Sequence, residues 1–337
     1  MHTRRHLFVS IASALVLCQT LAAPASAQQT TLLVYNAQHP SLTQGWVDAF
    51  TKETGIAVTL RNGNDTQLGN QIVQEGERTP ADVFLTENSP SMVLVDNAGL
   101  LAPLSPETLV GVAPQFRPSH GRWTGVAARA TIFVYDKRKL TQDALPKSLM
   151  DLAAAGWKGR WAASPSGGDF QAIVSAMLEL KGEGATLTWL KAMKQNAVIY
   201  RGNSVAMKAV NAGEADGAVI YHYYWIGDQA RTGENSGNLA VHYFGNQDPG
   251  AFVSISTAGV LKTSKQPAAA QALVKWIAGK NGQDFVLTGS AYVYPVGEGI
   301  AANERLKPMV DLQAPKIDPA KLDSRKVSEL MIAAGLL

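Results

Sequence analysis

Residues 31–60 read TLLVYNAQHPSLTQGWVDAFTKETGIAVTL, and their pattern indicates the architecture of the chain. Residues 31–37 form a short apolar run that predicts a strand. A helical pattern with its apolar residues on one face follows, and Ser41 and Gln44 fit a capping box at its start. A second apolar run occupies residues 56–60. A strand, a helix and another strand in this order predict parallel strands covered by helices.

The same alternation continues along the chain. It predicts further helices at 66–75, 168–180, 185–194 and 204–211, and further strands at 81–86, 160–164, 197–200 and 217–221. Two more apolar runs, at 130–136 and 251–260, are expected to cross between the two strand–helix units. The predicted fold class is therefore α/β with two lobes. The first lobe is expected to hold 28–128 plus 254–304, and the second 129–253 plus 305–337.

The first residues are typical of an export signal. Residues 4–5 are arginines, residues 7–21 are mostly apolar, and 25–27 read Ala-Ser-Ala, a small-x-small cleavage site. The apolar stretch is too short for a membrane span. The arginine pair also resembles a weak twin-arginine motif, so the export route stays open. Cleavage near Ala27 would remove Cys18, the single cysteine, and leave a periplasmic chain without disulfides.

Charge and length limit the possible binding partners and the number of lobes. The formal net charge of +3 falls to +1 when the two arginines of the export signal are removed. No run of lysine or arginine remains, which argues against nucleic acid and membrane surfaces as partners. The roughly 310 residues left after cleavage exceed one typical core, which favours two lobes within a monomer.

Three segments that directly follow predicted strands carry groups able to bind a metal. His39 follows the first strand and Glu87 the third, while Tyr223 and Tyr224 follow the strand at 217–221. In open parallel sheets, ligands bind beyond the carboxyl ends of the strands. These four side chains are therefore expected to meet in a cleft between the lobes.

The donor atoms of these four residues favour a hard cation. Tyrosine is rare in zinc sites, and calcium sites rely on carboxylates and carbonyls. A trivalent ion is able to displace the phenolic proton, whose usual pKa is about 10. Two phenolates and one carboxylate carry three negative charges, which match Fe³⁺ when the histidine is neutral. A six-coordinate ion would leave two positions, for an anion and a water molecule.

A predicted helix start offers a seat for that anion. Free N–H groups and the helix dipole at such starts bind anions. Asn203 begins a second helix, and Arg129 lies on a crossover strand. The residues predicted to hold a synergistic anion, phosphate or carbonate, are Ser166, Gly167, Gly168, Asn203 and Arg129.

Several segments resemble the periplasmic ferric-ion-binding proteins of bacteria, the bacterial transferrin family. Residues 34–39, VYNAQH, are similar to its Tyr-Asn-Gly-Gln-His segment, and residues 81–87, ADVFLTE, to its glutamate-bearing strand. Residues 222–225, HYYW, resemble its Asn-Tyr-Tyr-Trp iron motif. The resemblance covers most of the mature chain, with its segments in the same order.

This resemblance implies a type II periplasmic binding protein fold, with parallel-rich sheets, helices on both faces and a hinge of crossover strands. It implies capture of Fe³⁺ by His39, Glu87, Tyr223 and Tyr224, together with the synergistic anion. It also implies delivery of the iron to the permease of an ABC transporter in the inner membrane.

Three residues of this chain bear on the anion. Tyr221 and His222 stand where the family has paired asparagines, the first of which helps to hold the anion. Whether either residue joins the site stays open. Asp169 carries a charge that opposes an anion unless its side chain points away.

Two alternatives are weighed against ferric iron. The same fold could bind another small solute, such as an anion, a polyamine or an iron chelate. A hydrolase would need a nucleophile, and Ser166, His39 and Glu87 are the residues that a triad would use. However, the chain has no Gly-x-Ser-x-Gly elbow and no His-Glu-x-x-His motif, so no enzymatic activity is expected.

Overall fold

A computed structural model describes residues 31–337 of the chain. The predicted export signal, its cleavage near Ala27 and Cys18 lie outside the described residues. Within the described part, no helix combines the length and apolar character that crossing a membrane requires.

The strands form one hydrogen-bonded path in the order β2-β1-β3-β9-β4-β7-β5-β6, and β8 pairs with β4. Pairs inside the two strand–helix units are parallel, whereas every antiparallel pair includes β4 or β9. Their bounds are β1 (Thr31–Asn36), β2 (Ala57–Asn62), β3 (Val83–Thr86), β4 (Trp123–Asp136), β5 (Trp161–Ala163), β6 (Ala197–Ile199), β7 (Gly217–Tyr221), β8 (Leu239–His242) and β9 (Val253–Val260).

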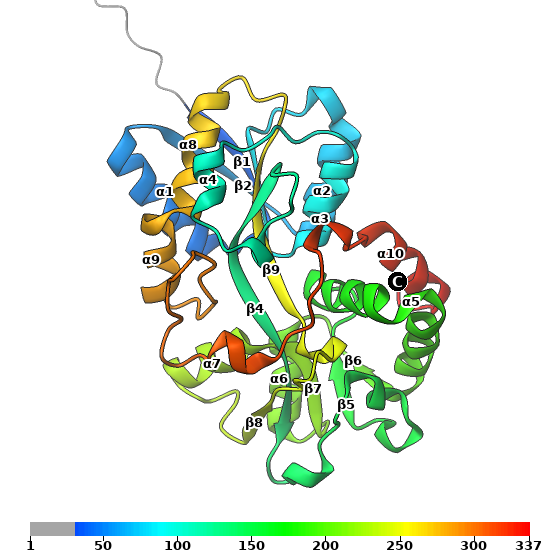
Figure 1. Cartoon of the computed structure of the whole chain (residues 1–337). Coiled ribbons are helices and arrows are strands. Elements are labelled where there is room, and N and C mark those ends of the chain that lie inside the picture. The colour runs from blue at the N-terminus through cyan, green and yellow to red at the C-terminus, as the bar shows by residue number, and fades with distance from the viewer. Residues whose placement is uncertain (1–30) are drawn as a thin grey trace, which may run out of the picture.

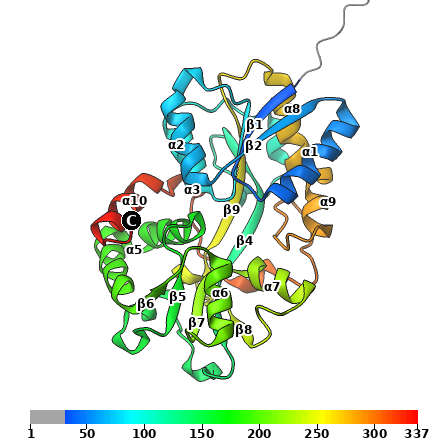
Figure 2. The same ribbon diagram turned by 180° about the vertical axis from the view of Figure 1, so that it is seen from behind.

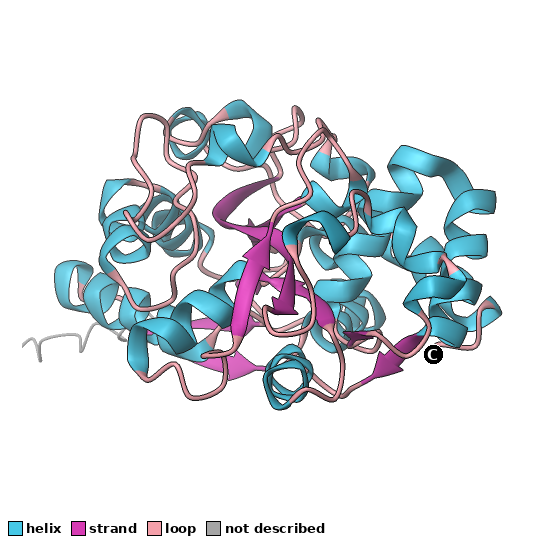
Figure 3. Ribbon diagram, turned by 90° about the horizontal axis from the view of Figure 1, so that it is seen from below, coloured by secondary structure: helices cyan, strands magenta, loops and turns pink. Residues whose placement is uncertain are grey.

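Helices cover both faces of this strand system, as the view from below shows (Figure 3). The helices are α1 (Pro40–Thr54), α2 (Asp65–Glu75), α3 (Ser89–Asn97), α4 (Pro106–Val110), α5 (Gly168–Asn196), α6 (Asn203–Ala212), α7 (His222–Arg231), α8 (Pro267–Ala278), α9 (Lys280–Thr288) and α10 (Ser324–Ala333). Because helices lie on both sides, every residue of β4 is buried, and most of its residues are apolar.

Two strands run through both halves of the molecule (Figure 1). The first part of β4 pairs with β9, and its second part, Thr131 to Tyr135, pairs with β7. We call the half around β1, β2 and β3 the first lobe, and the half around β5 to β8 the second lobe. The two-lobed α/β architecture matches the predicted fold class. The residue boundaries proposed for the lobes, 28–128 plus 254–304 and 129–253 plus 305–337, stay a prediction.

The C-terminal segment returns to the second lobe. Helix α10 packs against α5, and both lie on the same side of the molecule in the front and back views (Figures 1 and 2). Within the second lobe, Trp161 and Trp189 are fully buried with ring centroids 5.8 Å apart. Such large aromatic side chains supply much of the buried apolar area that holds the lobe together.

Two predictions about individual helices differ from the structure. The two helices expected at 168–180 and 185–194 form one element, α5, interrupted at Gly182, whose φ of 78° and ψ of 170° are not helical. The predicted capping box of Ser41 and Gln44 is wrong. Helix α1 begins at Pro40, and no side chain caps it. Proline at the first position explains the shift, because it starts a helix without needing a partner for an N–H group.

Candidate metal centre

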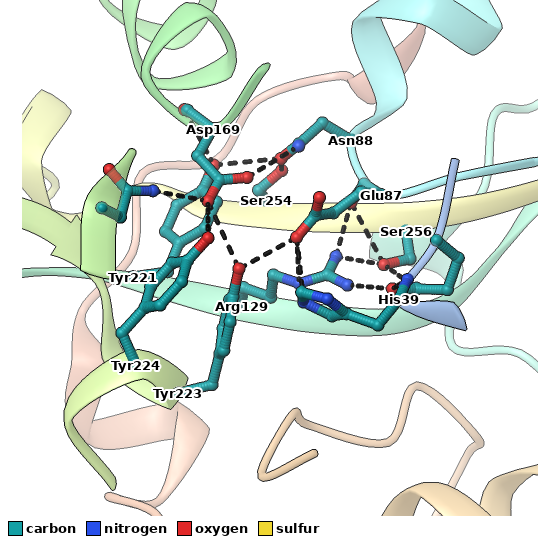
Figure 4. Close-up of polar contacts among 12 residues, drawn as sticks. His39, Glu87, Asn88, Arg129, Asp169, Tyr221, Tyr223, Tyr224, Ser254 and Ser256 are labelled. Atoms are coloured by element: carbon teal, nitrogen blue, oxygen red, sulfur yellow. Dashed lines mark hydrogen bonds and ion pairs between the residues drawn. The ribbon is translucent and has the colours of Figure 1, made fainter. Parts of the chain in front are cut away.

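The candidate site is built from residues just beyond the ends of strands. His39 precedes α1 directly, and Glu87 follows β3. Tyr223 and Tyr224 lie in the first turn of α7, directly after β7. Because β1 and β3 are parallel neighbours, their carboxyl ends bring His39 and Glu87 to the same sheet edge. Figure 4 shows that the two tyrosines face this pair from the second lobe.

The four predicted metal ligands are linked by a series of contacts. His39 Nε2 is 3.0 Å from Glu87 Oε1. The hydroxyl of Tyr223 donates a hydrogen bond of 2.9 Å to the same carboxylate oxygen. The rings of Tyr223 and Tyr224 have centroids 4.2 Å apart, so both phenols lie on one side of the cleft. The structure thus brings together a histidine, a carboxylate and two phenols from three distant segments.

A second carboxylate, Asp169, completes the cluster. It lies in the first turn of α5 and is buried. Its Oδ2 accepts hydrogen bonds from the Tyr224 hydroxyl at 3.2 Å and the Tyr223 hydroxyl at 3.4 Å. Asn203 Nδ2 donates to the same oxygen at 2.8 Å. The sequence places this acid after two glycines in the first turn of a predicted helix. From sequence it is expected to oppose an anion, and it is not among the predicted metal ligands.

The residues predicted to bind an anion differ in burial, and their role stays a prediction. Ser166 is exposed, and Gly167 and Gly168 are half-buried. Asn203 reaches the site, but its side-chain amide is bonded to Asp169. The place expected for an anion is therefore next to a carboxylate that the chain itself supplies.

Arg129 lies beside Glu87. Its guanidinium is fully buried and donates to Gln38 Oε1 at 2.6 Å, to the backbone carbonyl of Glu87 and to Ser256. Its Nε lies 3.8 Å from Glu87 Oε1. Arg129 therefore places a positive charge beside Glu87.

Burial and charge set the protonation of the cluster. Burial raises the pKa of Tyr223 well above its usual value, and the carboxylates of Asp169 and Glu87 raise it further. Burial and the same two carboxylates also raise the pKa of Tyr224. Burial and the charge of Glu87 raise the pKa of Asp169. For Glu87, His39 and Arg129 outweigh burial and lower the pKa.

Tyr221 and His222 differ in their relation to the site. Tyr221 joins the polar network, since its hydroxyl donates to Asn88 Oδ1 at 3.2 Å. His222 points away from the cluster. Its Nδ1 accepts from the backbone N–H of Ala130 at 3.0 Å, and its Nε2 lies 2.8 Å from the carbonyl of Tyr292. Burial lowers the pKa of His222 to about 4, so its ring is neutral near pH 7.

The donor set suits a hard, highly charged cation. Among residues 31–337, no group of three or more histidine, cysteine, aspartate or glutamate side chains is placed to hold a metal. A metal at this cluster would therefore need the phenolic oxygens, which favour trivalent ions over zinc or calcium. A pocket of about 340 Å³ opens beside His39, Tyr223 and Tyr224 and offers a route to solvent.

A family model described as bacterial extracellular solute-binding protein matches residues 45–314. The chain belongs to this family. The Fe(3+)-binding periplasmic protein of Serratia marcescens is 64% identical to this solute-binding protein over 313 residues, which cover 93% of this chain and 92% of that protein. The major ferric iron-binding protein of Neisseria meningitidis serogroup B is 37% identical over 320 residues, covering 94% and 96%.

A solved structure agrees with these relatives. The crystal structure of iron-bound HitA from Pseudomonas aeruginosa superimposes on this solute-binding protein with a TM-score of 0.85 and 42% sequence identity. The match covers 91% of this chain and all of that one. The predicted type II periplasmic binding protein fold and the family resemblance are therefore confirmed. The relatives named here are binding proteins and not enzymes.

Proposed function

We propose that this solute-binding protein carries ferric iron in the cleft between its lobes, with His39, Glu87, Tyr223, Tyr224 and Asp169 as ligands. One observation carries the proposal. The hydroxyls of Tyr223 and Tyr224 converge on the carboxylates of Glu87 and Asp169, at 2.9 Å and 3.2 Å. Ferric iron would displace the protons that these hydrogen bonds hold and bind the same oxygen atoms.

The charges of the site support a trivalent cargo. Two carboxylates and two phenolates carry four negative charges, and the buried guanidinium of Arg129 offsets one of them. The three negative charges that remain balance Fe³⁺ without an added anion. Such balance matters because an unpaired charge in a buried site costs several kcal/mol. Asp65 adds no charge near pH 7, because burial and the neighbouring charge of Glu87 raise its pKa to about 8.

Asp169 then takes the position expected for a synergistic anion. A phosphate or carbonate held by Ser166, Gly167, Gly168, Asn203 and Arg129 stays a prediction. The exposure of Ser166 and the bond from Asn203 to Asp169 favour the protein carboxylate. An anion that does enter would lie next to Asp169 and raise the electrostatic cost of the site.

The wider role follows from the relatives. The proteins from Serratia and Neisseria are named for ferric iron, which favours iron over a polyamine, a simple anion or a hydrolytic substrate. We infer that the chain is exported through its N-terminal signal and works in the periplasm as a monomer. It would deliver iron to the permease of an ABC transporter in the inner membrane.

The test is to load the purified mature chain with ferric iron supplied as a weak chelate. We expect one iron per chain and a visible absorption band from phenolate-to-iron charge transfer. The band should form equally in buffers with and without phosphate and carbonate. Absence of bound iron or of the band would contradict the ferric assignment. Iron that binds only with an added anion would restore the anion hypothesis and contradict the role of Asp169.

A further inference from the structure

Asn88 occupies the N-cap of α3, yet its side chain does not cap the helix. Asparagine at this position usually accepts a hydrogen bond from a free N–H group of the first helical turn. Here the side chain turns toward the cleft and is 2% exposed (Figure 4). A buried amide that gives up its usual local partner must find its hydrogen bonds elsewhere.

The amide of Asn88 finds four such partners. Its Nδ2 donates to Asp65 Oδ2 and to Asp169 Oδ1, both at 3.0 Å. Its Oδ1 accepts from Ser254 Oγ at 2.7 Å and from the Tyr221 hydroxyl at 3.2 Å. These bonds use both donors and both acceptor lone pairs of the amide.

The four partners come from three parts of the fold. Asp65 belongs to the first lobe, Asp169 and Tyr221 to the second, and Ser254 to the crossing strand β9. The full set of bonds therefore exists only when the lobes are closed. In that state Asn88 holds Oδ1 of Asp169, while Oδ2 of Asp169 faces the two phenols.

We propose that Asn88 is a positioning residue that orients Asp169 for iron and couples iron retention to closure of the lobes. The inference rests on the proposed ferric function. The amide suits the task because it donates to two carboxylates at once and still accepts from two hydroxyls. A carboxylate in its place would repel Asp169, and an apolar side chain would leave Asp65 and Asp169 short of a donor.

The decisive measurement is the rate at which a competing chelator removes iron from the loaded protein. Asn88→Ala should release iron about 10- to 100-fold faster than the wild type, the usual effect of losing a group that orients a metal ligand. Asn196→Ala is the matched control. Asn196 is also a buried asparagine, but its amide donates to the carbonyls of Ala153 and Ala154 within the second lobe. Its release rate should equal that of the wild type.

A milder variant keeps the test valid if Asn88→Ala does not fold. Ser254→Ala removes only the hydroxyl that anchors Asn88 Oδ1 and should accelerate release by a smaller factor. Thermal unfolding of the iron-free proteins separates lost stability from lost positioning, because Asn196→Ala should lower the melting temperature without changing release.

Two results would overturn the inference. Release from Asn88→Ala and Ser254→Ala at the wild-type rate would show that Asn88 does not position Asp169. Faster release from Asn196→Ala as well would show that any loss of stability has the same effect. A wild type that binds no iron would instead refute the proposed function itself, so the two failures are distinguishable.

Discussion

At the scale of single residues, the phenols of Tyr223 and Tyr224 decide the chemistry. Replacing either by phenylalanine keeps the ring and removes one anionic oxygen. We expect iron affinity to fall by more than about 100-fold, because changes to groups that only surround the ligands already cost 10- to 100-fold. The charge-transfer band should weaken and shift. Competition with a chelator of known affinity and visible spectra would measure both effects.

Tyr200 provides the control for this experiment. Its hydroxyl donates to Glu214 at 2.9 Å, outside the cluster. Tyr200→Phe should therefore keep wild-type affinity and colour. Unchanged affinity and spectra in both Tyr223→Phe and Tyr224→Phe would mean that the two phenols are packing residues and that the ferric proposal fails.

Asp169 allows a second prediction at this scale. Asp169→Ala removes the carboxylate and opens space beside Asn203 and the two phenols. Iron binding by the variant should be weak in anion-free buffer and recover when phosphate, carbonate or formate is added. The wild type should bind equally in all these buffers. If the variant is indifferent to anions and binds as well as the wild type, Asp169 is not a ligand.

Iron retention should depend on pH through the same groups. Burial and nearby carboxylates raise the pKa of Tyr223 and Tyr224, so both phenols are protonated in the iron-free protein near pH 7. Binding must release these two protons, and falling pH therefore weakens binding. Below the raised pKa of Asp169, a third proton joins the exchange. Glu87, whose pKa is lowered, contributes none at these pH values.

The slope of log affinity against pH measures the number of exchanged protons. It should be about two near pH 7 and steeper at lower pH, as expected when ligands must lose protons to bind a metal. Tyr223→Phe should reduce the slope by about one. An affinity that does not change with pH would contradict ligation by the phenols.

The limits of sequence reasoning are clearest at Asp169. Sequence alone identifies four candidate metal ligands, because each follows a strand and carries a strong donor: His39, Glu87, Tyr223 and Tyr224. The structure brings these four side chains together. Their role as iron ligands stays a prediction. Asp169 also follows a strand, but it lies in the first turn of α5, after the loop that leaves β5. However, sequence does not show that its side chain turns toward the phenols, nor that Asn88 and Asn203 donate to it there.

At the scale of elements, the break in α5 depends on one of two nearby glycines, which the sequence pattern alone does not distinguish. Gly182 has backbone angles that only glycine adopts readily, whereas Gly184, two residues later, has no such constraint. Neither position has a neighbour within 4 Å of an added methyl group. The two glycines therefore differ in backbone conformation and not in packing.

A pair of substitutions tests this difference. Gly182→Ala should destabilise the protein by about 1–3 kcal/mol, the usual cost of a strained backbone conformation. Gly184→Ala should stabilise it by about 0.5–1 kcal/mol, because alanine favours the helix and restricts the unfolded chain. Chemical denaturation of both variants beside the wild type would measure the change. Equal effects of the two substitutions would contradict the assignment of the break to Gly182.

The crossing strands illustrate a second limit at this scale. The sequence pattern predicts a strand at 130–136, but β4 extends from Trp123 to Asp136. Its first half includes Gly125 and an alternation broken by a bulge between Gly125 and Ala127. Glycine and lost alternation argue against a strand locally, while pairing with β9 imposes one. Tertiary pairing of this kind is not visible in a local pattern.

At the scale of the whole molecule, closure of the lobes brings negatively charged side chains close together. Glu87 from the first lobe and Asp169 from the second lie beside the phenols of Tyr223 and Tyr224. Arg129 is the fully buried cation beside Glu87, and it offsets only part of this charge. Closure without a cation therefore opposes like charges in a medium of low dielectric constant, where their repulsion is strong.

We therefore expect iron to shift the protein from open to closed lobes. Small-angle X-ray scattering should show a larger radius of gyration for the iron-free protein than for the loaded one near pH 7. The change should be absent when Tyr223→Phe is given iron at a concentration that saturates only the wild type, and Tyr200→Phe should close normally. A ligand shifts such an equilibrium only by its differential affinity for the two states, and the oxygen donors of both lobes meet only in the closed one. Identical scattering with and without iron would mean that closure does not depend on the cargo and that charge repulsion between Glu87 and Asp169 does not open the cleft.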